Sequence, residues 1–429
     1  MSRYEKSQLL LQQALTSIPL GTQTFSKSYK HYPKGISPHF ISHAKGAYAY
    51  DVDGNAYIDL VNSLAAITLG YANDEINQAV REQLEQGTIF SLPSEKEIEL
   101  SELLVDTIPS AQMVRFGKNS SDATSAAVRV SRAYTQRDRV AVCGYHGWHD
   151  WYIGSTDKNL GVPKAVSQLT STFQYNNIDS LHEVLNAYPN EFAAFILEPM
   201  NCEFPQDGFL EKVQALARQH GSVLIFDETV TGFRLDIGGA QSLFKVTPDL
   251  SCFGKGLANG FPISALVGKS DIMKLFDDVF YSFTYGGELL SIVAAIKAIE
   301  ILKRDQVLDG LEKNGQTLKT GIETMLSRLD LNDTFSISGH PSWTFMNVND
   351  SPSVDSFTLK TLFLQECFEN GILTLGTNNL SGSCDQQIIE QVLQRYESVF
   401  TTVKDALQTG TIEQRIKGEV LEPLFKVRH

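Results

Sequence analysis

The sequence predicts an α/β protein whose mainly parallel sheet is covered by helices on both faces, followed by a smaller C-terminal domain. Three observations carry this prediction. Between about residues 111 and 268, short apolar runs are separated by loops and helical segments, which is typical of buried parallel strands. The 429 residues are about three times the roughly 150 that serve as a prior for one domain. The composition, 42% hydrophobic and 20% charged, allows a sizeable buried core.

The elements follow in order along the chain. The first 50 residues mix short helix with loop, and 47–60 hold two apolar runs around Asp53 and Gly54, a hairpin pattern. The apolar runs predicted as strands are 113–116, 139–144, 193–198, 222–227, 249–253 and 264–268. Helices are predicted over 74–87, 95–107, Ala123 to Tyr134, 208–220 and 289–304. The expected division is an N-terminal segment (1–75), a large domain (76–309) and a small C-terminal domain (310–429).

Charge and composition exclude several classes of function. The chain carries 36 Lys and Arg against 50 Asp and Glu, a net charge of −14, so nucleic acid and anionic membranes are not expected partners. No apolar run approaches the ~18 residues of a membrane span. Five scattered cysteines without a CxxC pair indicate reduced thiols, and a cytoplasmic location is expected.

Lys255 is the first candidate for chemistry. It follows an apolar strand and stands between Gly254 and Gly256, whose lack of side chains lets backbone approach a ligand closely. A partly desolvated lysine is the residue type that forms Schiff bases. The alternative interpretation of the same sequence is a surface lysine in a glycine-rich turn.

Asp227 ends another predicted strand, in LIFDETVTGFR. A carboxylate at a buried strand end is usually paired or hydrogen-bonded. A cationic ring nitrogen of a bound ligand is one possible partner, and Arg234 in the same segment is the other.

Two further strand ends carry ligand-binding patterns. Ser120 and Ser121 stand where a helix begins, a position that offers N–H groups and a favourable dipole to phosphate, although an ordinary helix cap uses the same residues. Tyr145, in the segment 144–149, combines an aromatic ring with nearby glycines and suits stacking on a flat ligand. His146 and His149 are a weak zinc signal, because a third ligand at helical spacing is missing, and no metal is expected.

Together, a Schiff-base lysine, a buried acid, a phosphate cradle and a stacking ring are the parts that hold pyridoxal 5'-phosphate. The motifs in order are YDVDGNAYIDL (50–60), VRFGKNSSDAT (114–124), YHG (145–147), ILEPM (196–200), LIFDETVTGFR (224–234) and PDLSCFGKGLANGFP (248–262). With them the chain resembles the class III (subgroup II) aminotransferases, closest to the glutamate-1-semialdehyde aminomutase branch. The likeness runs from about residue 34 to 310, with a looser match beyond.

The resemblance implies fold type I, with a seven-stranded sheet, and roles for individual residues. It implies that Lys255 carries the Schiff base and that Asp227 pairs with the pyridine nitrogen. Ser120 and Ser121 match the family's phosphate-binding pair, and Tyr145 matches the ring that stacks on the cofactor. Thr284, in SFTYGGE, matches a threonine that reaches the phosphate of the neighbouring subunit, so a homodimer with shared active sites is implied.

The departures from the family pattern lie on both the cofactor and the substrate side. Ser120 replaces the usual glycine, and Thr229 stands where the family has a valine under the cofactor ring. Phe40 takes the place of the arginine that meets the substrate carboxylate in the aminomutases, and Leu64 replaces a tryptophan. A small free carboxylate would lose its bidentate partner at that arginine position.

The resemblance therefore favours an aminotransferase that moves an amino group from an amino acid, with L-glutamate expected, to an aldehyde or ketone. An oxidised sugar or sugar nucleotide is one expected acceptor, which would place the enzyme in carbohydrate biosynthesis. An intramolecular aminomutase is the alternative. A pseudoenzyme on the same fold and a zinc hydrolase using His146 and His149 are minor alternatives.

Overall fold

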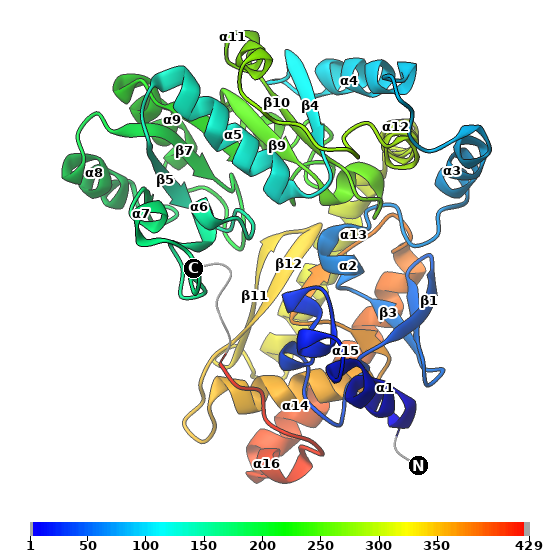
Figure 1. Cartoon of the computed structure of the whole chain (residues 1–429). Helices are drawn as coiled ribbons and strands as arrows, with labels where there is room; N and C mark the ends of the chain where they lie inside the picture. Colours follow the sequence, from blue (N-terminus) through cyan, green and yellow to red (C-terminus); the bar gives the residue numbers. More distant parts are fainter. Residues whose placement is uncertain (1–2, 424–429) are drawn as a thin grey trace. The chain divides into compact units, whose positions relative to one another are not determined.

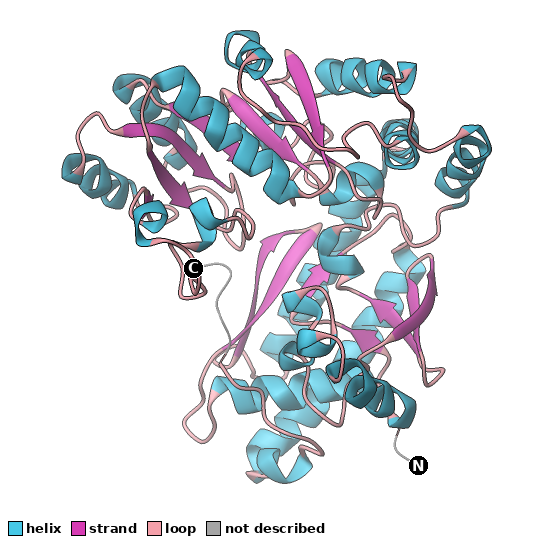
Figure 2. Cartoon of the chain, in the orientation of Figure 1, coloured by secondary structure: helices cyan, strands magenta, loops and turns pink. Residues whose placement is uncertain are grey.

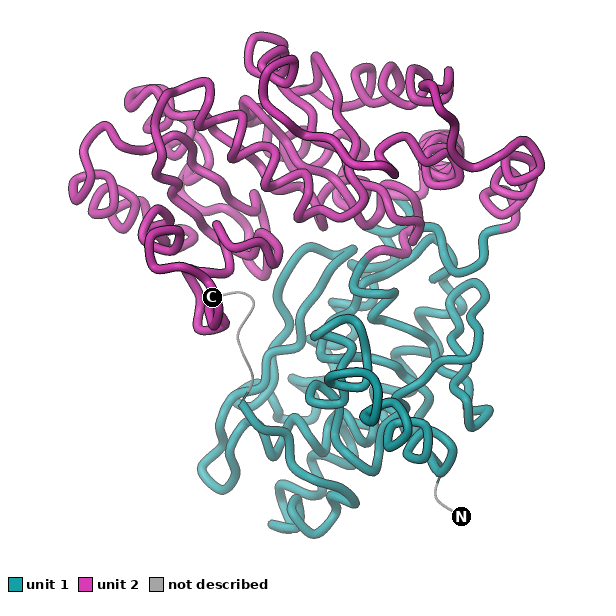
Figure 3. Tube along the Cα trace, in the orientation of Figure 1, with its two compact units in different colours: residues 1–65, 69–73, 309–424 teal, residues 66–68, 74–308, 425–429 magenta. Residues whose placement is uncertain are grey.

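The computed structural model describes residues 3–423, which form two compact units (Figures 1 and 3). Unit 1 contains residues 3–65, 69–73 and 309–423, and unit 2 contains 66–68 and 74–308. Most of the segment predicted as an N-terminal part thus lies in the same unit as the C-terminal residues. None of the helices between residues 3 and 423 combines the length and apolarity that crossing a bilayer requires.

Unit 2 is built on a seven-stranded sheet, which confirms the predicted fold class (Figure 2). The strand order is β4 (Met113–Gly117), β10 (Ser264–Gly268), β9 (Leu250–Phe253), β8 (Val223–Asp227), β7 (Phe192–Leu197), β5 (Arg139–Cys143) and β6 (Thr170–Thr172). β10 is antiparallel to both of its neighbours, and the other pairs are parallel. Six of the strands were predicted from apolar runs. β6 was not, because three residues are too short for a readable pattern.

Helices cover both faces of this sheet. They are α3 (Asp74–Gln86), α4 (Glu95–Thr107), α5 (Ser120–Thr135), α6 (Asp150–Ile153), α7 (Lys164–Ser167), α8 (Ile178–Ala187), α9 (Phe209–His220), α10 (Ala240–Phe244), α11 (Ser270–Met273) and α12 (Leu289–Arg304), with 3₁₀ turns η4 (Lys255–Ala258) and η5 (Lys274–Asp277). α5 begins three residues before its predicted start. Asp122 takes part in its N-terminal cap by accepting from the backbone N–H of Asn119 at 2.8 Å.

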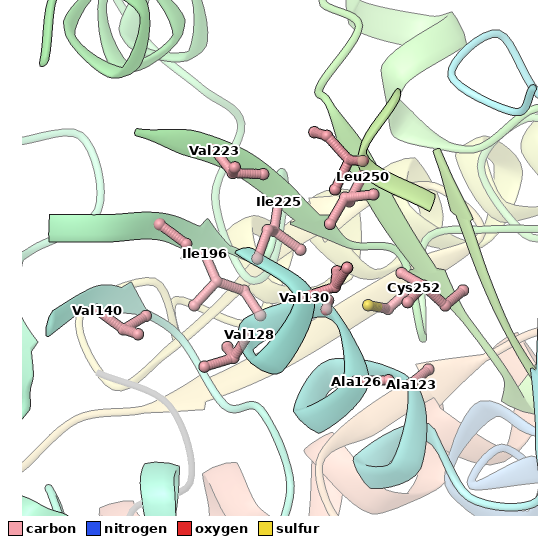
Figure 4. Packing of buried hydrophobic residues seen from close by; sticks show 14 of the residues in the cluster. Ala123, Ala126, Val128, Val130, Val140, Ile196, Val223, Ile225, Leu250 and Cys252 are labelled. Atoms are coloured by element: carbon pink, nitrogen blue, oxygen red, sulfur yellow. The ribbon is translucent and has the colours of Figure 1, made fainter. Parts of the chain in front are cut away.

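The core of unit 2 follows the alternation of strand side chains. Val140 and Val142 pack with residues of α5 on one face of the sheet, as Figure 4 shows for Val140 and its neighbours. Ala141 and Cys143, between and after them, pack with residues of α8 and α9 on the other face. Each fully buried aliphatic side chain contributes roughly 1.5–3 kcal/mol. Because side chains on both faces of these strands are buried, the strand sequences are continuously apolar.

Unit 1 contains two smaller sheets. One has the order β1 (Ile41–Lys45), β2 (Tyr48–Asp51), β3 (Ala56–Asp59) and β13 (Ile372–Leu373); the other has β11 (Phe335–His340), β12 (Trp343–Val348) and β14 (Thr377–Asn379). β2 and β3 form the hairpin predicted over 47–60, with Tyr48 opposite Ile58. The helices of this unit are α1 (Glu5–Leu15), α2 (Asn62–Ala65), nearly all of α13 (Val307–Arg328), α14 (Ser356–Glu369), α15 (Gln386–Thr409) and α16 (Ile412–Arg415), and its 3₁₀ turns are η1 (Pro19–Gly21), η2 (Phe25–Lys27) and η3 (Tyr29–His31).

α2 is a left-handed turn of four consecutive non-glycine residues, with φ values from 45° at Asn62 to 68° at Ala65. Such residues cost roughly 1–2 kcal/mol each. The buried carboxylate of Asp59 holds the turn by accepting from the backbone N–H groups of Val61 (2.8 Å) and Asn62 (2.9 Å). Leu64, which replaces the tryptophan of the resembled family, lies within this strained turn.

Candidate functional site

The polar residues singled out from the sequence follow strands that end at one edge of the unit 2 sheet. β4, β9, β8, β7 and β5 all point in the same direction, so their carboxyl ends lie at this edge. In open α/β sheets, ligands bind beyond these ends. The segments that follow the five strands are 118–122, 254–256, 228–229, 198 and 144–149.

Asp227, at the end of β8, is buried and bonded to His146 rather than to Arg234. Its Oδ2 lies 2.9 Å from His146 Nδ1, and its Oδ1 accepts from the backbone N–H of Thr229 at 3.1 Å. Burial alone would raise the pKa of Asp227, but these hydrogen bonds and the His146 charge outweigh it and hold the pKa below its usual value. The carboxylate is therefore available as an anion at neutral pH.

His146 orients the carboxylate of Asp227 through a hydrogen-bonding contact. Its Nε2 lies 3.1 Å from the backbone oxygen of Cys143, which accepts only, so Nε2 carries a proton. Nδ1 faces the carboxylate of Asp227. His146 is therefore a buried hydrogen-bonding partner that orients Asp227.

Lys255 lies in the turn that follows β9, with a left-handed φ of 41°. A lysine in this region of backbone space is strained, and strain of this kind clusters at functional sites. The flanking glycines permit close packing: a Cβ built on Gly254 would lie 2.2 Å from Ser120 Oγ, and one on Gly256 would lie 2.7 Å from Thr68 Oγ1. The lysine turn therefore packs directly on the start of α5.

Ser120 and Ser121 begin α5 and present its N-terminal backbone at the same edge. A Cβ on Gly147, whose φ is 103°, would lie 2.2 Å from Ser121 Oγ, so only glycine fits this approach. Ser121 Oγ accepts from the backbone N–H of Trp148 at 3.4 Å. This helix start, enclosed by glycines, fits a phosphate group.

Tyr145 follows β5, and its backbone N–H donates to the buried carboxylate of Glu198 at 3.1 Å. Its ring meets the ring of Tyr152 edge-on, with centroids 5.6 Å apart. Glu198 was not singled out from the sequence, because its role depends on the neighbouring position of β5 and β7.

Thr229 Oγ1 is a buried oxygen without a hydrogen-bond partner. Thr229 lies beside Asp227 and close to Gly254, with its Cγ2 3.8 Å from a Cβ built there. A buried hydroxyl left unbonded is costly, and a polar group of a bound cofactor would satisfy it. The strand-end residues thus fit pyridoxal phosphate: a lysine, an ionised acid, a helix start and an orphaned hydroxyl.

Thr284 and His149 make no hydrogen bond to this group within residues 3–423. Thr284 is exposed in the loop before α12, and its side chain makes no hydrogen bond within residues 3–423. His149 Nδ1 lies 2.6 Å from Ser125 Oγ, away from the partners of His146. In the described part of the chain, no three His, Cys, Asp or Glu side chains are grouped to hold a metal ion.

Glu228, next to Asp227, is fully buried and accepts from Thr231, from the backbone N–H groups of Ala240 (2.8 Å) and Gln241 (2.9 Å), and from Gln241 Nε2. Burial raises the pKa of Glu228 to about 7, although these hydrogen bonds act in the opposite direction. Its carboxylate connects the end of β8 to the start of α10.

We expect Glu228 to make the protein less stable as pH rises from about 4.5 to 7. In this window the folded chain retains a proton that the unfolded chain releases, so the free energy of unfolding falls by up to about 1.4 kcal/mol per pH unit. Glu228→Gln lacks this proton, and its stability relative to wild type should rise by about 2–3 kcal/mol between pH 5 and 7.5. Urea unfolding at the two pH values measures this, with the exposed Glu211→Gln as control. Equal pH slopes for wild type and Glu228→Gln would contradict it.

Comparison with known proteins identifies the family of this chain. The family model for class III aminotransferases matches residues 31–379. A 3-aminobutyryl-CoA aminotransferase of Cloacimonas acidaminovorans is 41% identical over 329 residues, covering 75% of this chain and 78% of the relative. A glutamate-1-semialdehyde 2,1-aminomutase of Methanosphaera stadtmanae is 34% identical over 375 residues, covering 84% and 87%. The FumI protein of Sphingopyxis sp. MTA144, solved in its PLP internal aldimine form, has a TM-score of 0.86 at 26% identity, covering 94% and 97%.

Proposed function

The chain belongs to the class III aminotransferases, which depend on pyridoxal phosphate, and we propose that it transfers the amino group of L-glutamate to an aldehyde or ketone. The observation that carries the proposal is the strained Lys255 turn, which follows the strand next to the one that ends in the ionised Asp227. Bound pyridoxal phosphate supplies an aldehyde for the lysine and a ring that accepts electrons.

The residues at the strand ends have separate roles in this proposal. Lys255 Nζ holds the cofactor and carries protons to and from the reacting carbon. Asp227 keeps the ring nitrogen protonated, and His146 positions Asp227. The start of α5 at Ser120 and Ser121 binds the phosphate, and Tyr145 lies against the ring.

The family includes both aminotransferases and aminomutases, and the substrate side favours transfer between two molecules. Phe40 stands where the aminomutases have an arginine, so a free carboxylate on the substrate lacks its bidentate partner there. An oxidised sugar or sugar nucleotide is the acceptor we propose first. The 41% identity to the 3-aminobutyryl-CoA enzyme favours a second candidate, a 3-aminoacyl thioester as amino donor.

We also propose a homodimer in which Thr284 completes the partner's phosphate site. Thr284 is exposed, and the aromatic residues around it are exposed as well: Phe280 to 76% and Tyr285 to 61%. Exposed apolar groups gathered in one loop are typical of an interface.

The test of the donor is a single half-reaction. Holoenzyme mixed with excess L-glutamate and no acceptor should form one equivalent of 2-oxoglutarate per chain, with bleaching of its absorbance near the visible edge. D-glutamate is the control and should give none. Absence of 2-oxoglutarate from L-glutamate would contradict glutamate as donor. A product isomeric with its substrate, formed without any donor, would instead support the aminomutase.

A further inference from the structure

Unit 2 contains a cavity of about 320 Å³ beside α5, lined by none of the strand-end residues proposed to hold the cofactor. One wall is formed by α5, with Val128, Arg129 and Arg132, and the other by residues at α6 and α7, including Trp151 and Val166. The volume falls in the range of small-molecule sites.

The two arginines give the cavity a positive wall. Arg129 and Arg132 are three residues apart on one helix and therefore face the same side. Each donates to a backbone oxygen, Arg129 Nη1 to Phe280 at 2.8 Å and Arg132 Nε to Asp138 at 2.7 Å. No ion pair within residues 3–423 includes either of them.

The pKa of Arg132 reflects its burial and the charges around it. Burial lowers the pKa of Arg132, the nearby Arg129 charge lowers it further, and Asp138 partly compensates. Asp150 also lines the cavity, as an exposed carboxylate that makes no ion pair within residues 3–423. The lining therefore keeps a net positive charge.

His149 adds a third donor. Trp151 Nε1 can only donate, and it donates to Ser125 Oγ at 2.8 Å. When the Ser125 hydroxyl donates to His149 Nδ1, 2.6 Å away, His149 Nε2 carries a proton. Arg129, Arg132 and His149 thus line one cavity with N–H donors.

We propose that this cavity is a binding site for a phosphate monoester carried on a small apolar body. Three oxygens of a phosphate match three donors, and its charge of about −1.5 to −2 matches two guanidinium groups better than a carboxylate does. Val128, Val166 and Trp151 supply the apolar contact. The site is separate from the proposed phosphate site at Ser121, which lies one helical turn before Ser125.

The test measures binding of phenyl phosphate to the pyridoxal-phosphate-loaded enzyme by calorimetry at low ionic strength. Loading fills the phosphate site at Ser121, so only additional binding is recorded. We expect one site per chain, an affinity at least tenfold weaker in Arg129→Gln and in Arg132→Gln, and benzoate at least tenfold weaker than phenyl phosphate.

The matched control is Arg218→Gln, which removes an exposed arginine from α9 and should change the affinity less than twofold. Arg129 is exposed, so its variant should retain the fold, as circular dichroism and cofactor content would verify. Absence of binding by wild type, equal binding by the folded Arg129→Gln variant, or benzoate binding as tight as phenyl phosphate would each overturn the proposal. These results do not depend on turnover, so they leave the proposed amino transfer untouched.

Discussion

Replacing Lys255 with alanine is expected to lower the rate of amino transfer by at least about 10⁴-fold, equivalent to about 5 kcal/mol of barrier. The lysine is proposed both to anchor the cofactor and to carry the proton, so one substitution removes two functions. The strained φ of 41° at this position is consistent with a residue kept for its side chain. Initial rates with L-glutamate at saturating pyridoxal phosphate measure the effect.

Two variants make this test specific. Lys274→Ala removes an exposed lysine of η5 in the same unit and should keep wild-type rates. Lys255→Arg keeps the positive charge but not an amine that can lose its proton, so it should be as inactive as the alanine variant. If Lys255→Ala kept more than about 1% of the wild-type rate, the role assigned to Lys255 would be wrong.

Replacing Asp227 with alanine is expected to lower kcat by about 10³-fold, while the Kd for pyridoxal phosphate rises by less than about tenfold. The carboxylate acts on the charge of the ring nitrogen, whereas the start of α5 contributes separately to binding the phosphate. Removing Asp227 also leaves the buried His146 Nδ1 without its hydrogen-bond partner, which costs roughly 1–3 kcal/mol of stability. Steady-state rates and cofactor titration separate the two effects on function.

Asp227→Asn separates the loss of charge from a loss of folding, because the amide keeps an oxygen for His146 but carries no charge. It should show the same loss of kcat with a smaller loss of stability. The control is Asp249→Asn, immediately before β9, where Asp249 accepts from the Leu224 backbone N–H at 2.8 Å and pairs with Lys269. A Kd that rose as much as kcat fell would show that Asp227 only anchors the cofactor.

The candidate site could be proposed from sequence where one residue and its local context suffice. Lys255 between glycines and Asp227 after an apolar run are both visible without any contact being known. The partner of Asp227 within the chain was not: the candidate was Arg234, and the structure has His146, 81 residues earlier. His146 and its backbone contact at Cys143 depend on how β5 and β8 lie around β7, which local periodicity does not encode.

Several structural features carried too little local signal to be predicted. β6 has only three residues, and the left-handed turn at 62–65 contains no glycine that would mark it. That turn depends on the side chain of Asp59. Glu198 became a candidate only once its bond to the Tyr145 backbone was known.

The sequence by itself determined the class of sheet in unit 2, because strands buried on both faces must be continuously apolar. It also determined which polar residues stand at strand ends, because a carboxylate or lysine that follows an apolar run can be recognised in the sequence. Tertiary structure alone decided which of these residues meet, that residues 3–65 and 309–423 share unit 1, and that α5 carries a cavity with two arginines unpaired by carboxylates. The physical reason is range: burial patterns repeat every two to four residues, whereas hydrogen-bond partners are chosen by strand order and direction across the whole chain.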